Sequence, residues 1–128
     1  MKSVKLRQYC DQRGSLVENT LEKIMLDSRH FFVSKSKPET IRGNHYHQNK
    51  SEWFYVIQGH CELVIEDIKT KKRIKKVIKD ADNIIVHIGP KQAHAFKNIG
   101  KNELILLALV NETLDQNQPD TYNYILLK

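Results

Sequence analysis

Short apolar stretches separated by turn residues recur along this chain of 128 residues. In residues 61–66, CELVIE, three apolar side chains at 61, 63 and 65 alternate with Glu62, Val64 and Glu66, as in a half-buried strand. A helical period is weakly visible over Asn19–Leu26 and nowhere persists for three turns. The pattern is typical of an all-β barrel or sandwich. The predicted strands are Val4–Tyr9, Ser15–Glu18, Phe31–Ser34, Thr40–His47, Glu52–Ile57, Cys61–Glu66, Arg73–Ile78, Asn83–His87, Ala93–Lys97, Leu104–Val110 and Tyr122–Leu126.

Two turns are well marked in the sequence. Gln58-Gly59-His60 separates Trp53–Ile57 from Cys61–Ile65, and we therefore expect these two strands to form a hairpin. The polar segment 98–102, NIGKN, links the preceding strand to Leu104–Val110 in a similar way.

Length and composition predict one domain over residues 1–128. The basic, polar N-terminus does not resemble a secretory signal, and no apolar run approaches the roughly eighteen residues of a membrane span. Of the two cysteines, Cys61 falls in the alternating apolar pattern and Cys10 lies near the N-terminus. We expect a cytoplasmic protein with two thiols, no disulfide and no membrane partner.

The net charge of +6 raises the question of nucleic acid binding. Much of the excess lies in residues 69–79, KTKKRIKKVIK, which contain no aromatic side chain. We interpret this segment as a solvated strand whose charges discourage pairing at a sheet edge, and expect no nucleic acid partner. A weak attraction for anionic substrates such as nucleotide sugars is a second interpretation.

Four residues form the pattern with the most chemical information. His45 and His47 are two positions apart on a predicted strand, so both imidazoles point to the same face. Glu52 begins the next strand and would return beside them if that strand pairs with the first. His94 is the candidate for a third imidazole. This donor set suits one divalent transition metal, with zinc expected first and manganese, iron or nickel as alternatives.

Further candidates surround these four residues. Arg42 could contact a phosphate or sugar, because a guanidinium forks onto phosphate oxygens, or could be an ordinary charge at the barrel rim. Tyr55 could line the mouth of the site or pack in the core, and Lys91 lies close to His94. The remaining histidines, His30, His60 and His87, are expected to have structural roles.

The joint spacing resembles the cupin superfamily of jelly-roll β-barrels. Its first motif, His-x-His followed by Glu and then Gly, corresponds to His45, His47, Glu52 and Gly59. In its second motif His94 and Asn98 match, but Lys91 stands where the family has a glycine. The resemblance implies a metal site at His45, His47, Glu52 and His94 and leaves the turn at Lys91 in question.

A narrower resemblance covers most of the chain. The segments DQRGSL at 11–16, RGNHYH at 42–47 and PDTY at 119–122 are similar to sugar-nucleotide cupins of polysaccharide biosynthesis, above all the C-terminal cupin of capsular polysaccharide-assembling enzymes. That resemblance implies C3 epimerisation of a nucleotide-linked 4-keto-6-deoxy sugar through an enolate. The capsular enzymes also carry a reductase domain, for which we expect a separate protein here.

Three alternatives stay open at this point. The related thymidine-diphosphate-sugar 3,4-ketoisomerases imply a metal-free reaction with His45 and His47 as acid and base. A non-enzymatic metal- or small-molecule-binding cupin would use the same ligands, and an iron dioxygenase would suit the three-histidine, one-glutamate set. Cupins commonly pair N-terminal strands between subunits, and we therefore expect a homodimer.

Overall fold

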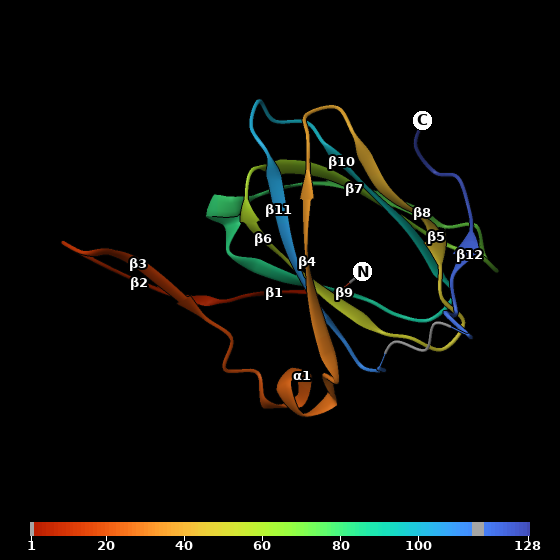
Figure 1. The fold of residues 1–128 in the computed structure, drawn as a ribbon, viewed down its shortest axis with the longest axis horizontal. Helices are drawn as coiled ribbons and strands as arrows, with labels where there is room; N and C mark the ends of the chain where they lie inside the picture. Colours follow the sequence, from red (N-terminus) through yellow and green to blue (C-terminus); the bar gives the residue numbers. More distant parts are fainter. Residues whose placement is uncertain (1, 114–116) are drawn as a thin grey trace.

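Two five-stranded antiparallel sheets face each other in the computed structural model, which describes residues 2–113 and 117–128 (Figure 1). The first sheet has the strand order β1-β9-β6-β11-β4. Its strands are β1 (Lys2–Lys5), β9 (Ile84–Ile88), β6 (Glu52–Gln58), β11 (Leu104–Val110) and β4 (His30–Ser36). The all-β architecture expected from the apolar pattern is confirmed.

The second sheet has the order β12-β5-β10-β7-β8. Its strands are β12 (Tyr122–Asn123), β5 (Ile41–Tyr46), β10 (Gln92–Asn98), β7 (His60–Asp67) and β8 (Arg73–Lys79). The lysine-rich strand β8 lies at the sheet edge, as its charge pattern predicted. A 3-10 turn, η1 (Asp80–Asp82), leads from β8 back to the first sheet.

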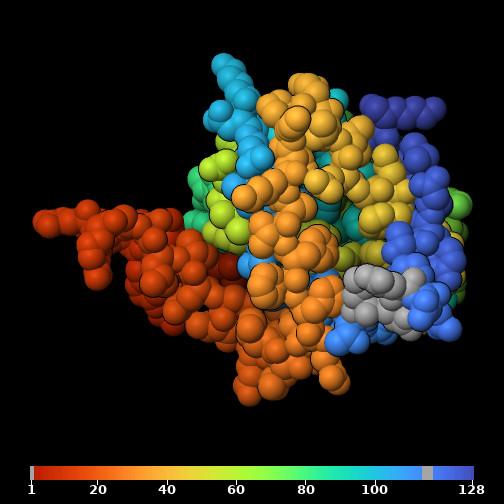
Figure 2. Space-filling view, viewed as in Figure 1, coloured from red at the N-terminus to blue at the C-terminus, as the bar shows by residue number. Residues whose placement is uncertain are grey.

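The N-terminal part departs most from the prediction. The strand expected over Val4–Tyr9 is divided at Leu6 into β1 and β2 (Arg7–Asp11), and β2 pairs with β3 (Gly14–Glu18). Leu6 is buried and its backbone N–H donates to the Asn83 oxygen, whereas both flanking strands are exposed. The β2–β3 hairpin projects from the body as a separate arm (Figures 1 and 2). The weak helical period becomes one short helix, α1 (Glu22–Asp27), and the last predicted strand shrinks to β12.

Both marked turns carry the chain from one sheet to the other. The hairpin expected around Gly59 is wrong, because β6 pairs with β9 and β11 whereas β7 pairs with β8 and β10. The turn at 98–102 likewise joins β10 of the second sheet to β11 of the first. Alternating polarity defines which face of a strand is buried, and a strand has the same pattern whether its successor lies beside it or opposite it.

An apolar core fills one end of the space between the sheets. Its buried side chains are Phe54, Val56, Cys61, Leu63, Ile65, Ile78, Val86, Ile88, Phe96, Leu104, Leu106 and Ala108. The rings of Phe54 and Phe96, both in this cluster, contact each other at a tilt of 49° with centroids 4.7 Å apart. Phe54 also lies 5.9 Å from the His94 ring, so the apolar core ends where the histidines begin.

The outer faces of both sheets are covered as well. Leu6, Ile24, Trp53 and Ile85 form one apolar cluster over the first sheet, and Val64, Ala93, Ala95 and Leu126 form another over the second. The chain segments that supply these covers are the N-terminal part with α1 and the C-terminal residues 124–127. No helix in the described part of the chain is long and apolar enough to cross a membrane.

Candidate metal centre

Both sheets contribute to a cluster of four side chains at the open end of the sandwich. His45 lies on β5, directly opposite His94 on β10, and His47 follows the end of β5. Glu52 is the first residue of β6, in the opposite sheet. The expected pairing of its strand with that of His45 is therefore wrong, and Glu52 reaches the imidazoles from across the sandwich. Ligand atoms of all four residues lie within 4.8 Å of one another.

A glycine allows β5 to approach β10 closely beside this cluster. Gly43 has φ +96°, and a Cβ placed there would lie 2.6 Å from the carbonyl oxygen of His94. The register between the two strands shifts at His94 and Ala95, which marks a bulge. Only glycine adopts this backbone geometry without a clash, and the opposition of His45 and His94 depends on it.

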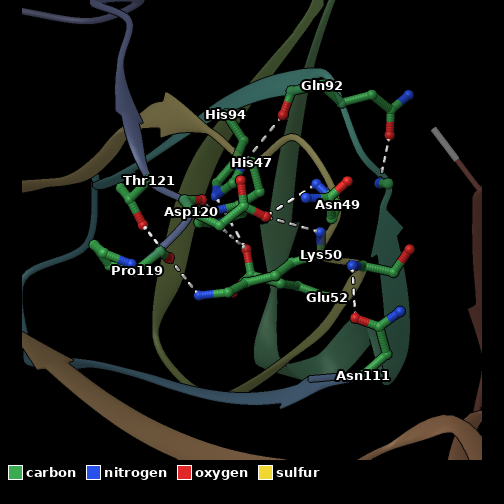
Figure 3. Close-up of polar contacts among 12 residues, drawn as sticks. His47, Asn49, Lys50, Glu52, Gln92, His94, Asn111, Pro119, Asp120 and Thr121 are labelled. Atoms are coloured by element: carbon green, nitrogen blue, oxygen red, sulfur yellow. Dashed lines mark hydrogen bonds and ion pairs between the residues drawn. The ribbon is translucent and has the colours of Figure 1, made fainter. Parts of the chain in front are cut away.

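Two of the imidazoles are oriented through their Nδ1 atoms. Nδ1 of His47 lies 2.7 Å from the backbone oxygen of Asp120, and Nδ1 of His94 lies 3.3 Å from that of Gln92 (Figure 3). Each Nδ1–H donates to its carbonyl, so each Nε2 presents its lone pair to the centre. Oε1 of Glu52 is 2.8 Å from Nε2 of His47 and 3.5 Å from Nε2 of His94. Metal-binding histidines commonly have this outer hydrogen bond, which fixes tautomer and ring orientation.

The protonation states suit metal binding. Burial lowers the pKa of His94 to about 4, and burial with the neighbouring His47 lowers the pKa of His45. Burial alone would raise the pKa of Glu52, but the contact with His47 and the other imidazoles outweigh it, and the net shift is downward. Burial would lower the pKa of His47, yet the contact with Glu52 raises it overall. The cluster therefore combines the Glu52 carboxylate with two imidazoles, His45 and His94, that stay neutral, while the contact with Glu52 favours the protonated form of His47.

Two atoms at the centre lack a hydrogen bond. Nε2 of His47 and Oε1 of Glu52 are buried and have no hydrogen-bond partner among the described residues. With the proton of His47 on Nδ1, the two atoms face each other with lone pairs, which is costly in a buried site. A second proton on His47, which its raised pKa favours, or a cation bound by both atoms would remove this cost. Three imidazoles and one carboxylate fit a borderline transition metal and leave coordination positions for a substrate.

The turn between His47 and Glu52 has a partner that the sequence did not reveal. The Asp120 carboxylate accepts hydrogen bonds from the backbone N–H groups of residues 48, 49 and 50 (Figure 3). Its slight burial would raise the pKa of the Asp120 carboxyl, but these three donors lower it overall. Residues 119–122, PDTY, resemble sugar-nucleotide cupins, but that resemblance implied no role for Asp120.

The cluster lies at the floor of an open cavity of about 1270 Å³. Apolar side chains of Phe54, Phe96 and Leu106 line its inner part. Arg42 lines it nearer the mouth, where its guanidinium donates to Ser36 Oγ and to the backbone oxygen of Lys35, each at 3.0 Å. These two contacts hold the Arg42 guanidinium at the cavity wall.

Two other candidates lie away from the cavity lining. Tyr55 points to the opposite face of β6, packs with the cover of the first sheet and donates to Asn83 Oδ1 at 3.1 Å. Its proposed place at the mouth is therefore wrong, because side chains alternate along β6 and Phe54 takes the inner face. Lys91 has φ +62°, which explains the glycine of the cupin motif, and its backbone N–H donates to the His47 oxygen at 2.7 Å. The turn forms with lysine at this position, and the Lys91 side chain does not line the cavity.

The other three histidines are separate from the cluster of four. His87 stacks on Trp53 with ring centroids 5.2 Å apart, and His60 is exposed in the turn region between the sheets. His30 lines the cavity, and its Nδ1 contacts the backbone oxygen of Glu112. Its imidazole thus faces the same space as the four candidate ligands without belonging to them.

Comparison with known proteins agrees with this arrangement. Residues 9–122 match the model of the polysaccharide biosynthesis C-terminal domain. The chain belongs to this family. A relative from Pseudomonas aeruginosa, UDP-2-acetamido-2,6-beta-L-arabino-hexul-4-ose reductase, is 31% identical over 114 residues, which are 89% of this chain and 30% of the relative.

Solved structures show the same fold. The capsular polysaccharide assembling protein CapF from Staphylococcus aureus has a TM-score of 0.74 and 30% identity, covering 94% of this chain and 34% of its own. A 3,4-ketoisomerase from Helicobacter canadensis has a TM-score of 0.79 and 23% identity, covering 94% of this chain and 87% of its own. The chain thus spans about a third of CapF and of the Pseudomonas relative. The resemblance to the cupin-type sugar-nucleotide proteins is confirmed.

Proposed function

We propose that this protein binds one divalent transition metal, zinc first among the candidates, and epimerises a nucleotide-linked 4-keto-6-deoxy sugar at C3 in surface polysaccharide biosynthesis. The observation that carries the proposal is the cluster of three imidazoles and one carboxylate whose ligand atoms lie within 4.8 Å of one another beside an open cavity, with His47 and Glu52 buried and in contact at its centre. The family supports a role in polysaccharide biosynthesis, and the names of the relatives support a nucleotide-linked sugar as the substrate class.

The reaction requires removal of an acidic proton. C3 of the sugar is α to the ketone, so loss of its proton to a base gives an enolate, and protonation of the opposite face by solvent from the open cavity completes epimerisation. A bound metal would act as a Lewis acid toward the developing oxygen charge. The protein's own side chains would hold the substrate and remove the proton.

We assign the base to His30. It lines the cavity and lies outside the four ligands, and its Nδ1 is engaged by the Glu112 carbonyl. Donation from Nδ1 leaves Nε2 as a proton acceptor. Arg42, fixed by its two contacts on β4, would hold the diphosphate of the substrate near the mouth. Epimerisation leaves the ketone unreduced, so a separate reductase acting on the product is the partner that this chemistry implies.

The decisive experiment begins with elemental analysis of the purified protein and of a Glu52→Ala variant. We expect about one equivalent of metal in the wild type and loss in the variant. Incubation with a 4-keto sugar nucleotide in D₂O should then place deuterium at C3. A His30→Ala variant should keep its metal and lose deuterium uptake by about 10²- to 10⁴-fold. Metal retention in the wild type without uptake on any such substrate would favour a non-enzymatic binding module.

A metal-free 3,4-ketoisomerase is the second candidate. Its support is the pair of imidazoles at the cavity floor, His45 and His47, with ring centroids 5.0 Å apart, on a fold shared with a solved ketoisomerase. Chelation separates the two proposals. If treatment with EDTA removes all metal and the protein still converts a 4-keto to a 3-keto sugar, His45 and His47 act as acid and base and the metal proposal fails.

We also propose a homodimer in which a second copy covers the arm and the free edge of β4. The arm exposes Tyr9 and Leu16, and the β4 edge exposes Phe31 and Val33. Apolar side chains on an unpaired strand edge favour association with another chain. Analytical ultracentrifugation should show a dimer that Phe31→Asp weakens, whereas Val77→Asp on the charged edge strand β8 leaves it intact. A monomeric wild type would refute this part of the proposal.

A further inference from the structure

Asp120, in the C-terminal segment, contacts both the turn between His47 and Glu52 and His47 itself. The carboxylate of Asp120 accepts hydrogen bonds from three consecutive backbone N–H groups, those of residues 48–50, at 2.8, 2.9 and 3.2 Å. The turn they form connects two candidate ligands, His47 and Glu52. A carboxylate that accepts several backbone N–H groups fixes the turn that presents them.

The backbone of the same residue contacts a ligand directly. The carbonyl oxygen of Asp120 lies 2.7 Å from Nδ1 of His47. Asp120 has φ +53°, a left-handed conformation that aspartate tolerates better than most residues. Carboxylate and carbonyl therefore reach the same turn from one residue, about seventy positions away in the sequence.

A third contact joins the same two segments, and here the turn provides the donor. Nζ of Lys50, a residue only 8% exposed, donates to the backbone oxygen of Pro119 at 2.7 Å. Residues 119–120 and 48–50 thus form one network beside the cluster (Figure 3). By contrast, Nδ1 of His94 uses a carbonyl of its own strand, that of Gln92.

We propose that Asp120 is a positioning residue for the metal site, acting through His47 and through the turn that joins His47 to Glu52. The inference rests on the metal-binding part of the proposed function. Without the carboxylate, the turn loses its three acceptor contacts, and the 2.8 Å approach of His47 Nε2 to Glu52 Oε1 is no longer held. Metal affinity should fall although all four ligands remain.

The test compares zinc affinity in Asp120→Gly, Asp120→Asn and the wild type. Glycine accepts the positive φ and removes the carboxylate but keeps the backbone carbonyl that contacts His47, so we expect affinity to fall about 10-fold, the low end of the range for loss of an outer-shell partner. Asparagine keeps one acceptor oxygen and tolerates the same backbone, and should recover part of the loss. Asp80→Ala is the control, because the Asp80 carboxylate accepts the N–H of Gly59 at 2.9 Å in a turn between the sheets that has no metal ligand.

Cobalt(II) absorption gives a second readout that a general loss of stability would not change. The visible bands should shift in Asp120→Gly, return toward the wild-type position in Asp120→Asn, and stay unchanged in Asp80→Ala. Wild-type affinity and an unshifted spectrum in Asp120→Gly would overturn the inference while leaving the metal site intact. Failure of the wild type itself to bind zinc or cobalt would instead refute the metal site, and the role of Asp120 with it.

Discussion

The two ends of the sandwich are built on opposite principles. At the closed end, large side chains such as Leu63, Ile78 and Leu104 are at most 2% exposed and belong to one apolar cluster. At the open end, buried side chains include His47, Glu52 and His94, and two of their polar atoms lack a hydrogen bond. Apolar burial stabilises the fold, whereas a buried polar cluster costs stability until a ligand completes it. We therefore expect stability to reside at one end and binding at the other.

The largest expected effect is a loss of stability caused by a substitution in the apolar core at the closed end. Leu63 is 1% exposed, and Leu63→Ala would leave a cavity that the surrounding strands cannot fill. The free energy of unfolding should fall by about 2–5 kcal/mol, measured by urea unfolding. Zinc affinity measured on the folded variant should stay within about twofold of the wild type. A large loss of affinity would show that the two ends are coupled.

Zinc should stabilise the protein only through the open end. At a free zinc concentration about one hundred times the dissociation constant, the free energy of unfolding should rise by about 2.7 kcal/mol, if zinc binds the folded state alone. Thermal unfolding with and without zinc measures this gain. Leu63→Ala should keep the gain and Glu52→Ala should lose it. An equal gain in Glu52→Ala would place the zinc elsewhere.

The same contrast explains what sequence could reveal. The candidate ligands His45 and His47 could be found because alternation puts both on one face of the expected strand, although His47 lies just after the end of β5, and His94 because a family motif marks it. Strand pairing could not be found, because the local pattern around Gly59 is equally compatible with a hairpin and with a passage between sheets. The turn at residues 48–51 has the same ambiguity, so Glu52 was expected on a strand paired with that of His45 and lies on the opposite sheet.

Long-range contacts could not be predicted from the sequence either. Asp120 meets the turn at residues 48–50 only through the folding of the C-terminal segment onto β5. Tyr55 and Phe54 are both aromatic and adjacent, and only the packing of α1 and Leu6 over the first sheet determines which one faces outward. A single strand pattern contains no information about what covers its second face.

Two glycines, Gly43 and Gly14, test how far the close approach of β5 to β10 supports the candidate metal site. Gly43 and Gly14 both have positive φ, but a Cβ at Gly43 meets the His94 carbonyl at 2.6 Å whereas one at Gly14 has no neighbour within 4 Å. Gly43→Ala should lower the free energy of unfolding by about 1–3 kcal/mol more than Gly14→Ala. It should also weaken zinc binding, because it displaces β5 from β10. Equal effects of the two substitutions on zinc affinity would contradict this role of Gly43.

The smallest effect concerns the two thiols. Cys61 is fully buried at the closed end, and burial raises its pKa to about 12, whereas Cys10 is exposed on the arm. Because the thiolate is the reactive form, a thiol reagent at neutral pH should label one equivalent in the native protein and two in denaturant. Cys10→Ser should remove the native labelling entirely. Rapid labelling of Cys61 in the native state would show that the closed end opens readily, and the division between a rigid end and a binding end would then fail.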